Sequence, residues 1–375
     1  MFSKEELARY NRHIIIPEFG IQGQQKLKQA KVLVVGSGGL GSPLLLYLAA
    51  AGVGTIGIVD FDIVDDSNLQ RQVLFTQSDI GKSKAEAARQ RVLDLNPHIN
   101  VVVYKEPFTS SNALNILQEY DIVADGTDNF PTRYLVNDAA VILGKVNVYA
   151  SIFRFDGQVS VFNYKYEDGS LGPNYRDLYP TPPPPGLVPS CAEGGVLGVL
   201  PGIVGALQAN EVIKVITGIG EPLVGRIHHF DALNFESKTF KIFKDEQAPA
   251  IKELIDYQQF CGMPAHEPSN ADNEITVGQL KAKMDAGEDF QLIDVREEHE
   301  YEIVNIGGEL IPLGQLLYET ESIQTDKPKY IICKTGDRSR DAVELLEAEG
   351  FDQLYNVKGG IFAYADEIDA QLTKY

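Results

Sequence analysis

A short apolar run followed by closely spaced glycines most strongly constrains the fold of this 375-residue chain. The run Val32–Val35 is typical of a strand buried on both faces of a parallel sheet. It is followed by Gly36, Gly38 and Gly41 in the G-x-G-x-x-G spacing, at the point where a strand should pass into a helix. Such a turn brings backbone N–H groups and a helix N-terminus close to a phosphate group. The stretch therefore predicts a nucleotide-binding site.

The segments that follow alternate between strand-like and helix-like patterns. We expect strands at residues 55–59, 100–104 and 121–124, with helices between them. This alternation predicts a doubly wound α/β fold with a mainly parallel sheet. The second strand ends at Asp60, where nucleotide-binding proteins of this kind place a carboxylate that binds a ribose hydroxyl.

Three charged residues follow the expected strand ends, where open parallel sheets bind their ligands. Arg71 lies in a polar loop after the second strand, and Lys84 begins a helix. Because the helix dipole disfavours a cation in the first turn, we expect Lys84 to face a bound anion; an ordinary surface lysine is the alternative. Asp128 follows a later strand and is a candidate Mg²⁺ ligand. It is also a candidate N-cap for the helix expected from Pro131 onward.

Short motifs in the first part of the chain together resemble the molybdopterin-synthase adenylyltransferase family of the MoeB/ThiF type. The motifs are Arg9–His13, Gly36–Gly41, Asp60–Asp62, Ser67–Gln72, Gly81–Lys84 and Gly126–Phe130. The family is related to ubiquitin-activating enzymes, and the resemblance covers residues 1–245. It implies an ATP-binding domain with a Rossmann-like, doubly wound mixed sheet. It also implies Mg²⁺-assisted, ATP-dependent adenylation of the C-terminal Gly-Gly carboxylate of a ubiquitin-like sulfur-carrier protein.

The resemblance also assigns roles to individual residues. The ATP site would comprise Gly36, Gly38, Gly39, Gly41, Asp60, Asn68, Arg71, Lys84, Asp128 and Asn129. Asp60 would hold the ribose, Arg71 and Lys84 would hold the phosphates, and the magnesium ion would bind Asp128. Arg12 would reach into the site of the partner subunit of a homodimer. This chemistry requires no protein nucleophile, because cations stabilise the charge that develops on the phosphates.

A proline-rich segment, residues 180–185, follows a β-hairpin whose turn is expected at Asp156–Gly157. The prolines exclude a helix or an interior strand, so we expect an extended surface loop. Cys191 ends this loop at the position where related activating enzymes carry a thioester or persulfide cysteine; a packed, unreactive cysteine is the alternative. Zinc-binding family members have Cys-x-x-Cys where this chain has residues 174–177. We therefore expect no structural zinc, and a loop held by packing alone.

The last part of the chain is expected to form a second, smaller α/β domain. Residues 246–274 mix prolines, charges and polar residues and are predicted to be a linker. Across residues 275–375 the sequence resembles a rhodanese, a sulfurtransferase domain. The resembling segments are 291–301, 330–339 and 357–361. The resemblance implies that sulfur from a cysteine desulfurase or thiosulfate is carried as a persulfide and delivered to the activated carrier as a thiocarboxylate.

The residues around Cys333 fit this chemistry. Cys333 ends an apolar strand and begins a loop that leads into a helix. The persulfide loop would comprise Cys333, Lys334, Thr335, Gly336, Asp337 and Arg338. Backbone N–H groups, the helix N-terminus and Arg338 would stabilise a thiolate or persulfide anion. A buried, inert cysteine is the alternative.

The composition of the chain limits the classes of binding partner and the cellular compartment that we expect. The formal net charge of −20 at pH 7 disfavours binding to nucleic acids or anionic membranes. Three widely spaced cysteines exclude a disulfide framework and a four-cysteine zinc site. The sequence shows neither an apolar stretch of membrane-spanning length nor a signal-peptide pattern, so we expect a cytoplasmic protein.

Two other functions stay open from the residues alone. The glycines and Asp60 also fit an NAD-dependent oxidoreductase, although that function leaves Arg71, Lys84 and Asp128 without a role. A non-catalytic scaffold that docks a carrier protein is the other alternative. The sequence does not specify whether the carrier serves molybdenum cofactor biosynthesis, thiamine biosynthesis or another pathway.

Overall fold

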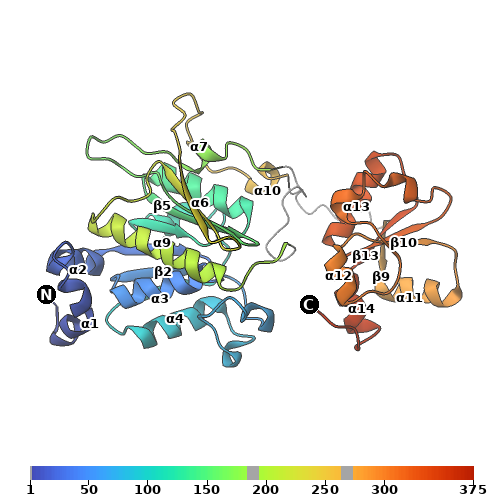
Figure 1. Cartoon of the computed structure of the whole chain (residues 1–375), viewed down its shortest axis with the longest axis horizontal. Coiled ribbons are helices and arrows are strands. Elements are labelled where there is room, and N and C mark those ends of the chain that lie inside the picture. Colours follow the sequence, from blue (N-terminus) through green and yellow to red (C-terminus); the bar gives the residue numbers. More distant parts are fainter. Residues whose placement is uncertain (1, 184–193, 263–272) are drawn as a thin grey trace. The chain divides into compact units, whose positions relative to one another are not determined.

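The computed structural model describes residues 2–183, 194–262 and 273–375. Residues 2–183 and 194–262 form one compact unit, and residues 273–375 form a second one (Figure 1). Cys191 and the last two prolines of the proline-rich segment lie outside the described residues. Among the helices of the described ranges, none combines the length and the apolar composition needed to cross a bilayer.

In its described part, the first unit contains a sheet of eight strands in the order β3-β2-β1-β4-β5-β6-β7-β8. The strands are β1 (Lys31–Val35), β2 (Thr55–Val59), β3 (Asn100–Tyr104), β4 (Ile122–Asp125), β5 (Val146–Phe153), β6 (Asp156–Phe162), β7 (Arg226–Asp231) and β8 (Glu236–Lys241). Neighbouring strands from β3 to β5 are parallel, whereas β5 to β8 pair antiparallel. The predicted doubly wound mixed sheet is confirmed.

Helices cover both faces of this sheet (Figure 1). The described helices are α1 (Lys4–Ile14), α2 (Gly20–Gln29), α3 (Gly41–Ala51), α4 (Lys84–Leu95), α5 (Ala113–Leu117), α6 (Phe130–Leu143), α7 (Tyr175–Leu178), α9 (Leu200–Thr217) and α10 (Tyr257–Phe260), with short 3₁₀ turns η1 (Asp66–Asn68) and η2 (Gln77–Asp79). Val32 and Val34 pack in one core with α3, α4 and α9, whereas Leu33 and Val35 pack in another with α5 and α6. Both faces of β1 are buried from Val32 onward, which agrees with the continuous apolar run at residues 32–35.

The register of the parallel strands brings predicted site residues to one edge of the sheet. Val35 pairs with Val59 of β2 and with Asp125 of β4, so these three strands end side by side. The glycine turn after β1, Asp60 after β2 and residues 126–129 after β4 therefore lie at the same edge. This carboxyl edge is where open α/β sheets bind their ligands.

The hairpin between β5 and β6 turns earlier than predicted. Phe153 pairs with Asp156, so the turn consists of Arg154 and the residue after it, and the predicted turn position is wrong. Arg154 adopts the left-handed conformation, with φ of 51°. Gly157 instead lies within β6, where a Cβ atom would lie 2.3 Å from Val204 Cγ2 of α9. This glycine therefore allows α9 to approach the sheet and does not form the turn.

A buried ion pair holds the segment that precedes the proline-rich loop. Arg176 of α7 donates to both oxygens of Asp138 on α6, with Nε–Oδ1 of 2.9 Å and Nη2–Oδ2 of 2.7 Å. The Tyr257 hydroxyl donates to Asp138 Oδ2 at 2.8 Å, so this part of the predicted linker, residues 246–274, packs on the first unit. The expectation that packing alone holds this segment is wrong, because the buried Asp138 carboxylate depends on these donors.

Replacing Arg176 should destabilise this part of the first unit. Arg176→Met leaves the Asp138 carboxylate buried without its bidentate partner, and we expect a loss of about 3 kcal/mol of unfolding free energy. Hydrogen-exchange mass spectrometry at increasing urea should then show exchange in α6 and α7 at lower urea than in the wild type. Lys238→Met, which breaks an exposed pair with Glu236, is the control and should leave exchange unchanged. Equal exchange in Arg176→Met and wild type would contradict the role of this ion pair.

The second unit contains a five-stranded parallel sheet in its described residues, in the order β11-β10-β12-β13-β9. Its strands are β9 (Glu274–Thr276), β10 (Gln291–Asp294), β11 (Glu309–Leu310), β12 (Lys329–Ile332) and β13 (Leu354–Lys358). Its helices are α11 (Val277–Ala286), α12 (Glu298–Ile303), α13 (Asp337–Ala348) and α14 (Gly360–Glu367), with 3₁₀ turns η4 (Leu313–Gln315) and η5 (Thr320–Ser322). Cys333 follows the central strand β12 directly, and α13 begins four residues later.

Candidate active sites

The glycines after β1 form a turn that residues with side chains would not adopt. Gly36 has φ of 89°, and its N–H donates to the Val59 carbonyl at 2.9 Å. A Cβ atom on Gly41 would lie 2.0 Å from the Gly36 carbonyl oxygen. Because α3 begins at Gly41, the turn presents the N-terminus of this helix at the carboxyl edge of the sheet. This geometry suits a phosphate group.

Asp60 is buried beneath the glycine turn and fixes its conformation. Its Oδ2 accepts hydrogen bonds from the Ser37 N–H at 2.8 Å and from the Ser37 hydroxyl at 2.7 Å. Its Oδ1 accepts from the Asp62 N–H at 3.0 Å. An ionised carboxylate offers about four acceptor positions, so these bonds leave capacity for a ribose hydroxyl. The ribose contact itself stays a prediction.

Lys84 faces an anion that belongs to the chain itself. The side chain is 7% exposed, and Nζ donates to Asp62 Oδ2 at 3.0 Å. Asp62 has a half-exposed carboxylate, and its backbone carbonyl accepts the Lys84 N–H at 2.9 Å. Lys84 is therefore not an ordinary surface lysine, and its ammonium group is held near the end of β2. A phosphate at this edge would either compete with Asp62 for the ammonium group of Lys84 or share that group with Asp62.

Arg71 lies against the glycine turn. A Cβ atom on Gly39 would lie 3.8 Å from Arg71 Cγ, and Arg71 Nη1 donates to the Ser67 carbonyl at 3.0 Å. The preceding Asn68 accepts the Asp65 N–H at 3.2 Å and so orders the 3₁₀ turn η1. Asn68 therefore shapes the loop that carries Arg71 to the glycine turn.

Asp128 and Asn129 follow β4 at the same edge. The Asn129 side chain accepts the Thr132 N–H at 3.0 Å and caps α6, so the alternative role of Asp128 as the N-cap is wrong. Asp128 lies one residue before the cap, and its side chain is exposed. Its carboxylate is thus presented at the edge where the strands end. Its predicted role as a magnesium ligand stays a prediction.

Two further polar residues at this edge, Asp125 and Gln208, are candidate site residues that the sequence did not single out. Asp125, the last residue of β4, is fully buried; burial raises its pKa, and the charge of Arg133 opposes that shift. Gln208 of α9 donates to the Asp125 carbonyl at 2.7 Å and to the Val148 carbonyl at 2.9 Å, joining β4 to β5. The position of Asp125 at a strand end was a usable signal. Gln208 carried none, because it lies in an apolar helix far along the chain.

Arg12 lies on the exposed surface of the last turn of α1. A single chain does not test whether this side chain enters the site of a partner subunit. The role of Arg12 across a homodimer therefore stays a prediction. Cys191 lies outside the described residues, and its reactivity stays a prediction as well.

In the second unit, Cys333 lies in a loop that surrounds its sulfur with donors. Cys333 is 1% exposed, and its Sγ accepts the Gly336 N–H at 3.1 Å. Gly336 has φ of 99°, and a Cβ atom there would lie 2.8 Å from the Gly359 backbone nitrogen. The Cys333 carbonyl accepts the Ile361 N–H at 2.9 Å, which ties the loop to the start of α14. Glycine is therefore required for the loop to close around the sulfur.

Ser339 provides a second contact to the sulfur that the sequence did not single out. Its Oγ lies 3.3 Å from Cys333 Sγ and 2.6 Å from Asn356 Oδ1. A hydroxyl group has one proton, so it donates either to Asn356 or to the sulfur. Donation to the sulfur is favoured when the sulfur carries negative charge. Ser339 therefore fits a site that alternates between thiol and persulfide anion.

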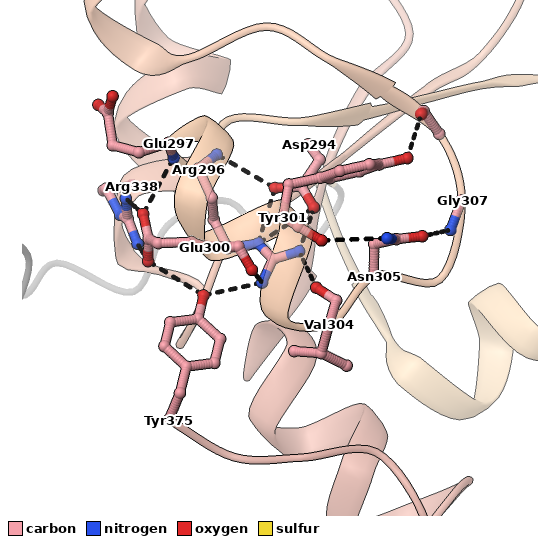
Figure 2. Close-up of polar contacts among 11 residues, drawn as sticks. Asp294, Arg296, Glu297, Glu300, Tyr301, Val304, Asn305, Gly307, Arg338 and Tyr375 are labelled. Atoms are coloured by element: carbon pink, nitrogen blue, oxygen red, sulfur yellow. Dashed lines mark hydrogen bonds and ion pairs between the residues drawn. The ribbon is translucent and has the colours of Figure 1, made fainter.

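Arg338, which the sequence predicts to stabilise an anionic sulfur, forms a bidentate ion pair with Glu300. Its Nη1 and Nη2 bind Glu300 Oε2 and Oε1 at 2.6 and 2.7 Å (Figure 2). Burial by itself would raise the pKa of Glu300, but hydrogen bonds from Arg338 and from the Glu297 N–H outweigh this effect and lower the pKa to about 2. The sequence predicts that Arg338 lies close to Cys333 because the two are near each other along the chain. It does not predict the partner of Arg338, because Glu300 lies on the separate helix α12.

The Glu300 ion pair predicts an acid-sensitive contribution to the second unit. Because the pKa is lowered from 4.5 to about 2, the ionised carboxylate stabilises the fold above about pH 4.5, and this stabilisation is lost as the pH falls towards 2. Glu300→Gln should cost on the order of 2–3 kcal/mol at pH 7 and clearly less at pH 3. Urea-dependent hydrogen exchange in peptides of α12 and α13 would measure both differences.

The matched control is Glu302→Gln, on the exposed face of the same helix. This variant should leave exchange close to wild type at both pH values. A cost of Glu300→Gln that is the same at pH 3 and pH 7 would contradict the assigned ion pair.

Comparison with protein-family models assigns a family to each of the two units. Residues 10–250 match the model of the ThiF family, and residues 276–367 match the model of the rhodanese-like domain. This chain belongs to the ThiF family. The resemblances drawn from the sequence, to a MoeB/ThiF-type domain and to a C-terminal rhodanese domain, are thereby confirmed.

Relatives of this ThiF-family chain match either its whole length or about two thirds of it in extent. The probable adenylyltransferase/sulfurtransferase MoeZ of Mycobacterium tuberculosis is 51% identical over 379 residues, which cover 100% of this chain and 96% of MoeZ. The sulfur carrier protein adenylyltransferase of Thermus thermophilus is 52% identical over 268 residues, covering 70% of this chain and 99% of that protein. The crystal structure of E. coli MccB with MccA-N7isoASN covers 67% of this chain and 76% of its own chain, with a TM-score of 0.58 and 24% identity. That likeness supports the fold alone.

Proposed function

We propose that this ThiF-family chain is an adenylyltransferase and sulfurtransferase that activates a ubiquitin-like sulfur-carrier protein and converts its C-terminal Gly-Gly carboxylate into a thiocarboxylate. The observation that carries the first half is the position of Asp60, Arg71 and Lys84 at one carboxyl edge of the sheet. Asp60 and Arg71 contact the glycine turn, and Asp62 holds Lys84 near the end of β2. The names of the relatives support the same activity. An NAD-dependent oxidoreductase and a non-catalytic scaffold are both disfavoured by the family.

The charged residues at the edge suit attack by a carboxylate on ATP. An oxygen of the carrier carboxylate forms a bond to the α-phosphorus, the bond to the β-phosphate oxygen breaks, and pyrophosphate leaves with the electron pair. Arg71 and Lys84 would offset the negative charge of the phosphates, which otherwise repels the attacking carboxylate. Asp60 would orient the ribose while it holds the glycine turn.

A magnesium ion fits the carboxylate of Asp128. Asn129 caps α6 in its place, so the exposed Asp128 side chain is available at the same edge as the glycine turn. Magnesium bound to nucleotide phosphates typically takes only one or two protein carboxylates, and one is offered here. When bound, the ion would supply positive charge to the phosphates.

The rhodanese-like unit would supply the sulfur. A Cys333 thiolate would attack the outer sulfur of thiosulfate, forming an S–S bond and releasing sulfite; a cysteine desulfurase persulfide is the other donor. The terminal persulfide sulfur would then attack the acyl-adenylate carbonyl and expel AMP, leaving an acyl disulfide. A second thiol would then attack Cys333 Sγ, forming a disulfide with Cys333 and releasing the thiocarboxylate, and a reducing thiol would regenerate Cys333. Cys191 is one candidate for the second thiol, and a cellular thiol is the other.

We further propose a cytoplasmic homodimer in which Arg12 of each subunit serves the site of the other. The exposed position of Arg12 supports this arrangement. The carrier would be one that serves molybdenum cofactor or thiamine biosynthesis, or a related sulfur pathway. All of these carriers present the same Gly-Gly carboxylate to the site.

Carrier-dependent exchange of pyrophosphate into ATP tests the adenylation half directly. We expect Arg71→Ala, Lys84→Ala and Asp128→Ala each to lower the exchange rate by about a hundredfold, the usual effect of removing an electrostatic catalytic group. Arg89→Ala, on the exposed face of the helix that Lys84 begins, is the matched control and should exchange at the wild-type rate. Cys333→Ala should also exchange normally, since sulfur transfer follows adenylation. Wild-type exchange in all three site variants would overturn the proposal.

A further inference from the structure

A row of polar side chains leads from the sulfur of Cys333 to the edge strand β9 of the second unit. Ser339 Oγ, on α13, lies 3.3 Å from Cys333 Sγ and 2.6 Å from Asn356 Oδ1. Asn356 Nδ2 in turn donates to Glu274 Oε1 at 3.4 Å. Ser339 and Asn356 are buried, whereas the side chain of Glu274 is partly exposed. The surroundings of the sulfur thus extend through α13 and β13 to β9, beyond the loop that carries Cys333.

The register of the strands fixes the position of Asn356. It pairs with Ile331 of β12 on one side and with Glu274 of β9 on the other. Because paired residues of neighbouring strands point to the same face of a sheet, the side chains of Asn356 and Glu274 lie on the face of Ile331. Ile331 and Cys333 belong to an apolar core that includes Leu346 of α13. Asn356 therefore places a polar group beside an apolar core, where an unsatisfied donor or acceptor is costly.

Glu274 determines which end of the Asn356 amide faces Ser339. An ionised carboxylate only accepts hydrogen bonds, so the amide directs its NH₂ group to Glu274 and its oxygen to Ser339. That oxygen competes with the sulfur of Cys333 for the single proton of the Ser339 hydroxyl. With the amide reversed, its NH₂ group would donate to Ser339 and leave the hydroxyl proton to the sulfur alone.

We propose that Asn356 is a positioning residue of the sulfur site, which holds the Ser339 proton away from Cys333 while the sulfur is neutral and releases it when the sulfur becomes an anion. The proposal deepens the proposed sulfurtransferase function and rests on it. Ionisation of Cys333 then deprives Asn356 Oδ1 of its donor, so the anion is stabilised less than by an uncontested hydroxyl. A less stabilised sulfur anion is the better nucleophile, which suits a cysteine that must pass its sulfur on.

Carbon-13 NMR of the full chain, labelled at cysteine Cβ, tests the proposal, because this chemical shift follows the ionisation of each thiol without any added reagent. The Cys333 signal is the one lost in Cys333→Ser, and the midpoint pH of its titration is measured for each variant. Asn356→Leu removes the competing oxygen, so the midpoint should fall by about half a pH unit. Ser339→Ala removes the donor, so the midpoint should rise by about the same amount.

The decisive comparison is made in the Ser339→Ala background. Asn356→Leu should have no effect there, because Asn356 acts on the sulfur only through the Ser339 proton. Val357→Ala shortens a side chain of the same strand in the other core of the unit, and this control for a general loss of packing should keep the wild-type midpoint. The charged and titratable side chains of the loop and its neighbours are the same in all of these variants, so their effects on the midpoint cancel; they are Lys334, Asp337, Arg338, Glu300, Lys358 and Tyr375.

A midpoint in Asn356→Leu that equals or exceeds the wild-type value would overturn the proposal, and so would an equal fall in the Ser339→Ala background. If Asn356→Leu does not fold, Glu274→Gln replaces it, because an amide at this position no longer fixes the orientation of Asn356. Its midpoint should lie below that of Glu344→Gln, which removes an equal charge from the same surface hollow. Equal midpoints in these two variants would overturn the proposal.

The proposed function fails on a different result, namely the absence of thiosulfate-to-cyanide sulfur transfer in the wild type. The titration of Cys333 requires neither a sulfur donor nor an acceptor. The failure of the role of Asn356 is therefore distinguishable from the failure of the proposed function.

Discussion

The tight approach between Gly36 and Gly41 is the contact on which the nucleotide end of the molecule depends. A Cβ atom on Gly41 would lie 2.0 Å from the Gly36 carbonyl oxygen, so only glycine lets α3 begin this close to the turn that follows β1. Asp60 then holds this turn through Ser37, and the parallel register places β2 and β4 alongside. Charged side chains from separate loops consequently gather at one edge of the sheet.

The second unit also has a candidate anion site where a parallel strand passes through a glycine-containing loop into a helix. A parallel strand, β12, ends in a loop that turns at a left-handed glycine and leads into a helix, and the backbone N–H of Gly336 donates to the Cys333 sulfur. Under the proposed function, the anion in the first unit is a phosphate of ATP, and in the second it is a sulfur on the chain. Both sites would then stabilise negative charge with fixed donors, which suits transfer reactions in which charge develops on the group being moved. Their presence in one chain fits an enzyme that activates a carboxylate and then supplies it with sulfur.

Much of this arrangement could be predicted from the sequence because it depends on local patterns. The apolar run before Gly36, the acid at the end of β2 and Cys333 at the end of a strand all follow from spacing along the chain. The partners of the charged residues could not be predicted in this way. Lys84 pairs with Asp62, Arg176 with Asp138, and Arg338 with Glu300, and each pair forms only after distant elements pack together. The position of the hairpin turn at Arg154 was not predicted for a related reason. Gly157 suggested a turn in the sequence, but a glycine is needed there because α9 packs closely against it.

The central claim is that one chain carries out both activation and sulfur delivery. It is tested most directly by measuring the mass of the carrier protein after incubation with ATP, thiosulfate, a reducing thiol and the full chain. With the wild type, we predict the mass gain produced when sulfur replaces one carboxylate oxygen. With Cys333→Ala, we predict that the carrier is adenylated but gains no sulfur. Formation of the thiocarboxylate by Cys333→Ala at the wild-type rate would contradict the account.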